Sequence, residues 1–167
     1  MFDYHASLND AHPFSSKWYT WPIMLKPVWY YVAYPTEGFR ETICGIGNPA
    51  IWWVGSLSLI YVIINMLRKR KLNYVFISIL ALSLWLPYAF IGRVMFMYHY
   101  FPVVPFMMLA IVALVKMLEE KLKTKWIYFI YIGIVILMFL FFYPVVSGKA
   151  MPNTYLDSLE WLDSWYW

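Results

Sequence analysis

Two segments of the sequence combine residue types that could do chemistry, and the first covers residues 12–22. Its candidate residues are His12, Ser16, Lys17, Trp18 and Trp21. Aromatic faces beside hydrogen-bonding groups suit a sugar, because a sugar ring has one apolar face and a rim of hydroxyls. The same residues also suit an aromatic belt at a membrane surface, with Lys17 among the lipid headgroups. Both interpretations stay open at this point.

The second segment begins at Arg93 and includes Tyr98 and His99. Arg93 separates two long apolar runs and is therefore predicted to lie in a short turn at the membrane surface. A guanidinium group there could pair with a phosphate, which its planar fork of donors fits well. His99 is expected at or just below the surface, where ionisable residues are functional candidates. The alternative is that Arg93 extends to lipid headgroups and His99 caps the start of a helix.

Motifs of several common enzyme classes are missing from the sequence. There is no HExxH metal motif, no CxxC pair and no spacing typical of a Ser–His–Asp triad. The single cysteine, Cys44, excludes a disulfide framework and a cysteine-rich metal site. The glycines at 45 and 47 lack the Lys-Ser/Thr ending of a phosphate loop and predict a tight turn instead. We therefore expect no metal ion and no cofactor, and we assign no catalytic residue.

The composition predicts that a membrane positions these segments. Of the 167 residues, 63% are hydrophobic and only 13% are charged, whereas roughly a quarter of a soluble domain is charged. Four apolar stretches are long enough for helices that cross the hydrocarbon core, which takes about 20 residues. We expect transmembrane helices at about residues 50–67, 72–92, 97–118 and 126–146.

Basic residues predict the orientation of these helices. A run from Arg68 to Lys71 separates the first two helices, and lysines at 116, 121, 123 and 125 separate the last two. Because positive charge is enriched on the cytoplasmic side of membranes, both termini are expected outside the cytoplasm. The net charge of +4 then reflects topology and gives no reason to expect nucleic-acid binding.

Residues 1–49 are predicted to form an extracytoplasmic, aromatic-rich loop segment. Prolines at 13, 22, 27 and 35 exclude a long continuous helix there. An outward segment of this length without a signal-peptide pattern is more natural when other spans precede it. The sequence therefore reads as the C-terminal part of a larger membrane protein.

Residues 147–167 are predicted to form an extracytoplasmic tail that carries an interfacial helix. Thr154 and Asp157 fit a capping box, and apolar side chains recur at helical spacing after them, at Tyr155, Leu159, Leu162 and Tyr166. Such a stripe would lie in the membrane interface or against the outer loop. The predicted fold is an all-α integral membrane protein with four transmembrane helices between the N-terminal loop segment and this tail.

Several motifs, in their order along the chain, resemble the protein O-mannosyltransferases. The resemblance is to the C-terminal four-span region of the bacterial polyprenyl-phosphate-mannose–protein mannosyltransferases. The motifs are HPFSSKWYTWP at 12–22, GNPAIWW at 47–53, LPY at 86–88, RVMFMYHYFPVVPF at 93–106 and the tryptophan-rich ending. Each motif alone is weak, but their order and their placement among four spans make the set fairly specific.

This resemblance implies a multi-pass GT-C glycosyltransferase of the bacterial plasma membrane, in EC class 2.4.1. Such enzymes move mannose from a polyprenyl phosphate to Ser or Thr of proteins that cross the membrane. The implied partners are membrane lipid, the lipid-linked sugar, the acceptor protein and the N-terminal part of the same enzyme. The family's catalytic acid lies in an Asp-Glu pair of the first outer loop. That pair has no counterpart here, so the chain alone is expected to be inactive.

The resemblance also implies roles for the candidate residues. Arg93, Tyr98 and His99 would lie near the lipid phosphate or the donor sugar, where positive charge would stabilise the departing phosphate. The outer cavity would be lined by His12, Ser16, Lys17, Trp18 and Trp21. Two alternatives remain: a non-enzymatic four-helix membrane or lipid-binding subunit, and a GT-C transferase with another acceptor.

Overall fold

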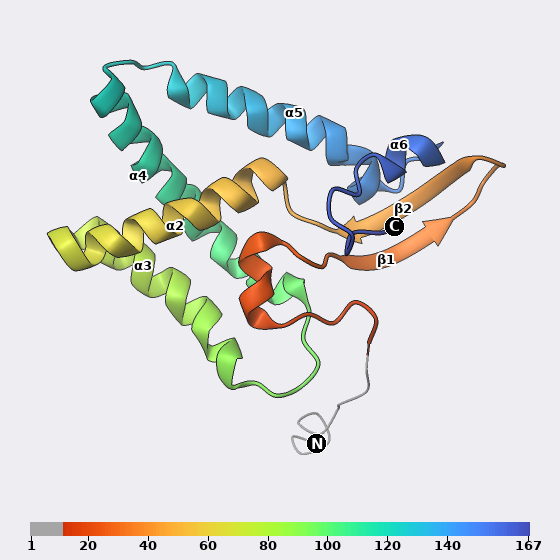
Figure 1. Ribbon diagram of the computed structural model, residues 1–167, viewed down its shortest axis with the longest axis horizontal. Coiled ribbons are helices and arrows are strands. Elements are labelled where there is room, and N and C mark those ends of the chain that lie inside the picture. The colour runs from red at the N-terminus through yellow and green to blue at the C-terminus, as the bar shows by residue number, and fades with distance from the viewer. Residues whose placement is uncertain (1–11) are drawn as a thin grey trace.

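The computed structural model describes residues 12–167, and most of them are helical (Figure 1). Four helical segments are long and apolar enough to cross a membrane: Pro49–Lys69, Leu72–Phe90, Met97–Leu122 and Ile127–Ser147. The four helices expected from the sequence are thus confirmed. Two of them, α2 (Pro49–Lys69) and α5 (Ile127–Ser147), are continuous α-helices of 21 residues each.

Prolines divide the other two segments into an α-helix and a tighter 3₁₀ turn. Helix α3 (Leu72–Trp85) ends just before Pro87, which lies in the 3₁₀ turn η2 (Leu86–Phe90). Helix α4 (Val104–Leu122) begins after the 3₁₀ turn η3 (Met97–Val103), which contains Pro102. Proline has no backbone N–H and its ring obstructs the preceding helical turn. A short non-helical stretch, residues 91–96, therefore joins the two segments and carries Arg93.

The segment before α2 is more regular than the irregular loop expected from its prolines. It contains a 3₁₀ turn, η1 (Trp18–Ile23), and an antiparallel hairpin of β1 (Val28–Ala33) and β2 (Phe39–Gly45). A short third strand, β3 (Met151–Pro152), pairs with the other edge of β2. Aromatic and β-branched residues dominate β1, and such side chains favour strands. The prolines interrupt this segment only between its elements or inside the 3₁₀ turn.

The tail after α5 differs from the long interfacial helix predicted for it. Helix α6 covers only Asn153–Asp157, and its N-cap residue, Pro152, offers no side-chain cap. Leu156 of α6 is fully buried, and beyond this helix the chain turns inward and also buries Leu159, Trp165 and Trp167. The predicted stripe fails because residues 158–167 follow turns rather than a helical repeat, so Tyr166 stays 40% exposed.

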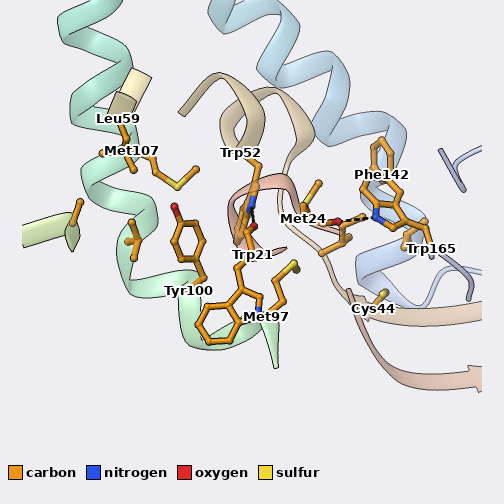
Figure 2. Close-up of a cluster of buried hydrophobic side chains, with 14 of the residues drawn as sticks. Trp21, Met24, Cys44, Trp52, Leu59, Met97, Tyr100, Met107, Phe142 and Trp165 are labelled. Atoms are coloured by element: carbon orange, nitrogen blue, oxygen red, sulfur yellow. Dashed lines mark hydrogen bonds between the residues drawn. The ribbon is translucent and has the colours of Figure 1, made fainter. Parts of the chain in front are cut away.

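The core lies where η1, the N-terminal ends of α2 and α4, and the tail meet (Figure 2). Trp21, Trp52 and Tyr100 pack there against several methionines, and each of these three aromatic side chains is at most 2% exposed. Gly55 permits a close approach between α2 and α4, because a Cβ atom at Gly55 would lie 2.8 Å from Cβ of Met107. The core thereby fixes η1 against the helices.

Candidate functional site

A cleft of about 670 Å³ opens between η1 and the loop that follows η2. We call it the cationic cleft. Its walls come from three parts of the sequence: the segment around η1, the loop between η2 and η3, and the tail. It is lined by Ser15, Ser16, Lys17, Trp18, Tyr19, Thr20, Leu25, Lys26, Ala89, Ile91, Gly92, Arg93, Val94, Met95 and Ser164.

The charge of the cleft has one sign. Lys17, Lys26 and Arg93 line it, and none of its lining residues is acidic. Within residues 12–167 the only ion pair joins Arg40 to Asp157, so the three cations have no carboxylate partner there. The Lys17 ammonium group lies 6.0 Å from the centre of the Tyr19 ring. A concave site lined by several cations attracts anions such as phosphate or carboxylate groups.

One backbone hydrogen bond joins the two walls of the cleft. The amide of Ser16 donates to the carbonyl of Met95 over 2.8 Å. The Ser16 hydroxyl in turn accepts a hydrogen bond of 3.0 Å from the indole N–H of Trp21. Both segments singled out in the sequence therefore meet in one site, with hydroxyl and aromatic groups beside the cations.

Hydrogen bonds from side chains elsewhere in the chain to backbone carbonyls hold the wall formed by residues 18–25. Side-chain donors from α2, α3 and the tail bond these carbonyls at Trp18, Trp21, Pro22, Ile23, Met24 and Leu25. Two of these bonds, from Trp52 to Trp21 and from Trp165 to Met24, are drawn in Figure 2. Pro22 lacks an N–H, and a 3₁₀ turn leaves carbonyls at its end unpaired. The donors in question are the indoles of Trp52, Trp53, Trp85 and Trp165 and the hydroxyls of Ser56 and Ser164.

Four of the predicted site residues line the cleft, namely Ser16, Lys17, Trp18 and Arg93. Arg93 is exposed in the loop between η2 and η3. Trp18 packs edge-on against Trp85, with 5.5 Å between the ring centres, and its carbonyl accepts a hydrogen bond of 3.0 Å from the Trp85 indole. The Trp18 indole is thus held in place at the cleft wall.

The other four predicted residues are not part of the cleft lining. Trp21 is fully buried and reaches the cleft only through its bond to Ser16. His99 is half-buried, and its ring stacks on Tyr98 at 4.5 Å and on Trp21 at 5.9 Å. Its Nδ1 atom accepts a hydrogen bond of 3.4 Å from the Phe96 amide, so His99 caps the start of η3. His12 is exposed and packs edge-on against Phe96 at 5.0 Å.

Sequence reasoning missed Lys26 and Ser164 as lining residues. Lys26 lies next to Pro27 outside the first candidate segment, and only the turn after η1 brings it back to the cleft. Met24 makes this turn with a left-handed backbone, at φ 56°. Ser164 belongs to the tail, and no local pattern could have related it to residues 15–26. Residues 12–167 contain no cluster of three His, Cys, Asp or Glu side chains that could hold a metal ion.

Comparison with known families and proteins gives a consistent result. Residues 1–165 match the family described as the C-terminal four TMM region of protein-O-mannosyltransferase. Similar curated proteins include the polyprenol-phosphate-mannose–protein mannosyltransferase of Mycobacterium tuberculosis, 27% identical over 98% of this chain and 35% of the relative. Another is dolichyl-phosphate-mannose–protein mannosyltransferase 5 of Saccharomyces cerevisiae, 26% identical over 99% of this chain and 25% of the relative. The chain thus spans about a third of the length of its bacterial relatives and a quarter of that of the yeast relative.

A solved structure shares the fold. It is the S. cerevisiae protein O-mannosyltransferase Pmt1-Pmt2 complex bound to the sugar donor, with a TM-score of 0.78 and 19% identity. The similarity covers 99% of this chain and 25% of that chain. At 19% identity this similarity shows the fold alone, that is, the arrangement of the helices and the hairpin.

Proposed function

The chain belongs to the protein O-mannosyltransferase family as its C-terminal four-span region, and from this premise we propose that the cationic cleft binds a polyprenyl-phosphate mannose donor. The proposed reaction transfers mannose to Ser or Thr of proteins that cross the membrane. The observation that carries the proposal is that Lys17, Lys26 and Arg93 line one cleft without any acidic neighbour in its walls.

The proposed chemistry of the cleft is the stabilisation of a leaving group. When the bond between mannose and phosphate breaks, negative charge grows on the phosphate oxygens. Fixed cations that are already in place stabilise this charge more in the transition state than in the bound donor, which accelerates the reaction. Arg93 is the strongest candidate, because its guanidinium group can donate two parallel hydrogen bonds to a phosphate. Trp18 and the hydroxyls of Ser16 and Thr20 offer a stacking surface and hydrogen bonds for the sugar.

The lipid part of the donor has a suitable neighbour. An apolar groove of about 380 Å³ lies between η1, α2 and α3 and includes Ile23, Leu57, Ile60 and Ala81. Trp18 in the cleft packs against Trp85 in this groove. An amphipathic donor needs a polar and an apolar site side by side, and this arrangement supports a donor of that class.

The base that deprotonates the acceptor hydroxyl is proposed to come from another part of the transferase. General-base catalysis needs a group such as a carboxylate within hydrogen-bond reach of that hydroxyl. The cleft lining has none among the described residues. Tyr98 and His99 remain proposed donor-binding residues, although neither lines the cleft in this structure.

We also propose that the cleft faces the outside of a bacterial plasma membrane, with both termini on that side. The support is the charge distribution: Arg68–Lys71 and Lys121–Lys125 lie at the opposite ends of the helices from η1 and the hairpin. These basic loops would then lie in the cytoplasm.

The test of the proposed function is an Arg93→Gln substitution in the full-length transferase. Mannosyl transfer from a polyprenyl-phosphate donor should fall by about 10²-fold or more, as for the loss of other charge-stabilising donors. The matched control is Arg68→Gln, which changes the same kind of exposed residue at the far end of α2. Transfer that stays at the wild-type rate in Arg93→Gln, at equal expression, would assign Arg93 to lipid anchoring instead.

A further inference from the structure

The tail reaches across the molecule to the turn that ends η1. The indole N–H of Trp165 donates to the Met24 carbonyl over 2.8 Å (Figure 2). The hydroxyl of the neighbouring residue, Ser164, donates to the carbonyl of Leu25. Two consecutive tail residues therefore hold two consecutive carbonyls of the turn.

These carbonyls depend on the tail for their partners. Met24 has a left-handed backbone that ends η1, so the carbonyls at this turn point away from the helical ladder. Met24 is fully buried. A buried carbonyl without a hydrogen bond is costly, so loss of its donor should favour another conformation of the turn.

The turn and the tail are also parts of the cleft wall. Leu25, Lys26 and Ser164 all line the cationic cleft. Lys26 directly follows Leu25, whose carbonyl accepts the hydrogen bond from Ser164. The position of the Lys26 backbone therefore depends on that of Leu25. The tail thus contacts the part of the cleft wall that contains Lys26.

Trp165 is itself firmly anchored. Its ring stacks on Trp53 of α2 at 6.1 Å and on Trp161 at 6.2 Å, and packs edge-on against Phe142 of α5 at 6.0 Å. Its side chain is 1% exposed. A donor fixed by two helices holds a carbonyl more firmly than a solvent-exposed one would.

We propose that Ser164 and Trp165 are positioning residues, which hold the turn at Met24–Leu25 so that Lys26 is placed to bind the anionic ligand of the cleft. The identity of that ligand rests on the proposed function, whereas the positioning itself does not. Trp165 would therefore affect the affinity for the ligand without contacting the reacting atoms.

The experiment compares two single variants of the full chain in detergent, Trp165→Phe and Ser164→Ala. Hydrogen exchange measured by mass spectrometry reports on the amides of residues 20–27. Calorimetric titration with farnesyl phosphate, a soluble isoprenyl phosphate, gives the affinity of the cleft. Both variants should show faster exchange in this segment and weaker binding. Trp165→Phe loses a buried hydrogen bond and should bind roughly three- to tenfold more weakly, whereas Ser164→Ala loses an exposed one and should show a smaller loss of affinity.

Two further variants separate positioning from general stability. Trp167→Phe makes the same change of side chain, but the lost bond goes to the carbonyl of Leu156, which is not a lining residue of the cleft, and a phenyl ring keeps an aromatic neighbour for Trp165, whose ring centre lies 5.8 Å from that of Trp167. It should leave exchange at residues 20–27 and farnesyl phosphate affinity unchanged. Ser164→Thr keeps the hydroxyl and should restore the affinity that Ser164→Ala loses.

Four outcomes decide between the possibilities. Unchanged exchange at residues 20–27 in both Trp165→Phe and Ser164→Ala would overturn the proposal. So would equal effects of Trp167→Phe and Trp165→Phe, or faster exchange with wild-type affinity. Faster exchange in a chain whose wild type does not bind farnesyl phosphate would support the positioning of the turn and contradict the proposed function.

Discussion

The hydrogen bond from the Ser16 amide to the Met95 carbonyl fixes two cations in one cleft. Lys17 follows Ser16 directly and Arg93 lies two residues before Met95, so this 2.8 Å bond brings both side chains to the same walls. Like charges in a concave site repel each other and destabilise the fold until an anion binds between them. The arrangement of these cations therefore favours the binding of an anion.

Anion binding should stabilise the chain. Farnesyl phosphate at about 100 times its dissociation constant should add about 2.7 kcal/mol to the free energy of unfolding. Thermal unfolding in detergent measures this as a rise in the midpoint. Lys17→Gln should reduce the rise, whereas Lys69→Gln, at the end of α2, should not. An equal rise with farnesol would show that the phosphate plays no part.

The Ser16 hydroxyl is predicted to matter through Trp21. Ser16→Ala removes the acceptor of the fully buried Trp21 indole, whose N–H then has no partner. The expected loss of stability is about 1–3 kcal/mol. Ser83→Ala removes an exposed hydroxyl that bonds the Leu80 carbonyl and should have almost no effect. Comparable losses in the two variants would mean that the bond to Trp21 contributes little.

Gly47 is predicted to be intolerant of any side chain. A Cβ atom at this position would lie 2.1 Å from the ring of Trp52. Trp52 would have to shift, and its 2.7 Å hydrogen bond to the Trp21 carbonyl would be lost. Gly47→Ala should therefore destabilise the chain by about 2–4 kcal/mol, in the range of overpacking plus one lost buried bond.

The matched control for this prediction is Gly133→Ala in α5. No atom lies within 4 Å of a Cβ atom built there, so the added methyl group meets open space. Alanine also favours helices over glycine. Thermal unfolding should show an unchanged or slightly raised midpoint. A fall like that of Gly47→Ala would mean that the loss in Gly47→Ala cannot be assigned to crowding at Trp52, because Gly133 has no such neighbour.

Much of this architecture was predictable, because its signals are local. The spans follow from runs of apolar residues, and Pro87 and Pro102 mark where the regular helices stop. The cleft residues Lys17, Trp18 and Arg93 were predicted from residue types next to the predicted membrane surface. The hairpin was missed because prolines between elements resemble prolines that prevent structure.

What the sequence could not reveal are contacts between distant segments. The sequence gives no sign of which groups the indoles of Trp52, Trp53, Trp85 and Trp165 contact. In the structure each donates to a carbonyl of residues 18–24. An aromatic residue looks the same in sequence whether its N–H meets water, a sugar or a backbone carbonyl. Only the folded position of η1 distinguishes these cases.

The ion pair between Arg40 and Asp157 is predicted to hold the hairpin to α6. Its atoms lie 2.6 Å apart, and Arg40 is only 15% exposed, while Asp157 is 57% exposed. Asp157→Asn would leave a largely buried guanidinium group without its counter-charge. We expect a loss of about 1–2 kcal/mol, between the values for exposed and buried pairs.

A double-variant cycle with Arg40→Met measures this coupling. The losses of the two single variants should add to more than the loss of the double variant, because the second change removes the group that the first left unpaired. Simple additivity would mean that the pair contributes nothing beyond its separate side chains. Unfolding in detergent provides all four free energies.

The free energy of unfolding is predicted to depend on pH through Glu160. Burial raises the pKa of Glu160 above its usual 4.5, and the nearby Asp157 adds to this, against the opposing effects of the Trp167 amide and Arg40. The folded state therefore binds the proton more tightly than the unfolded state does. The contribution of Glu160 to stability is therefore greatest below the usual pKa and declines as pH rises from 4.5 through the raised value. Glu160→Gln, which can still accept from the Trp167 amide, should remove this decline and be the more stable chain at neutral pH.

Unfolding midpoints measured from acidic to neutral pH test the sign, and Asp163→Asn in the same tail should keep the wild-type slope. A midpoint of Glu160→Gln that falls below wild type at neutral pH would mean that the Glu160 carboxylate stabilises the tail in its charged form.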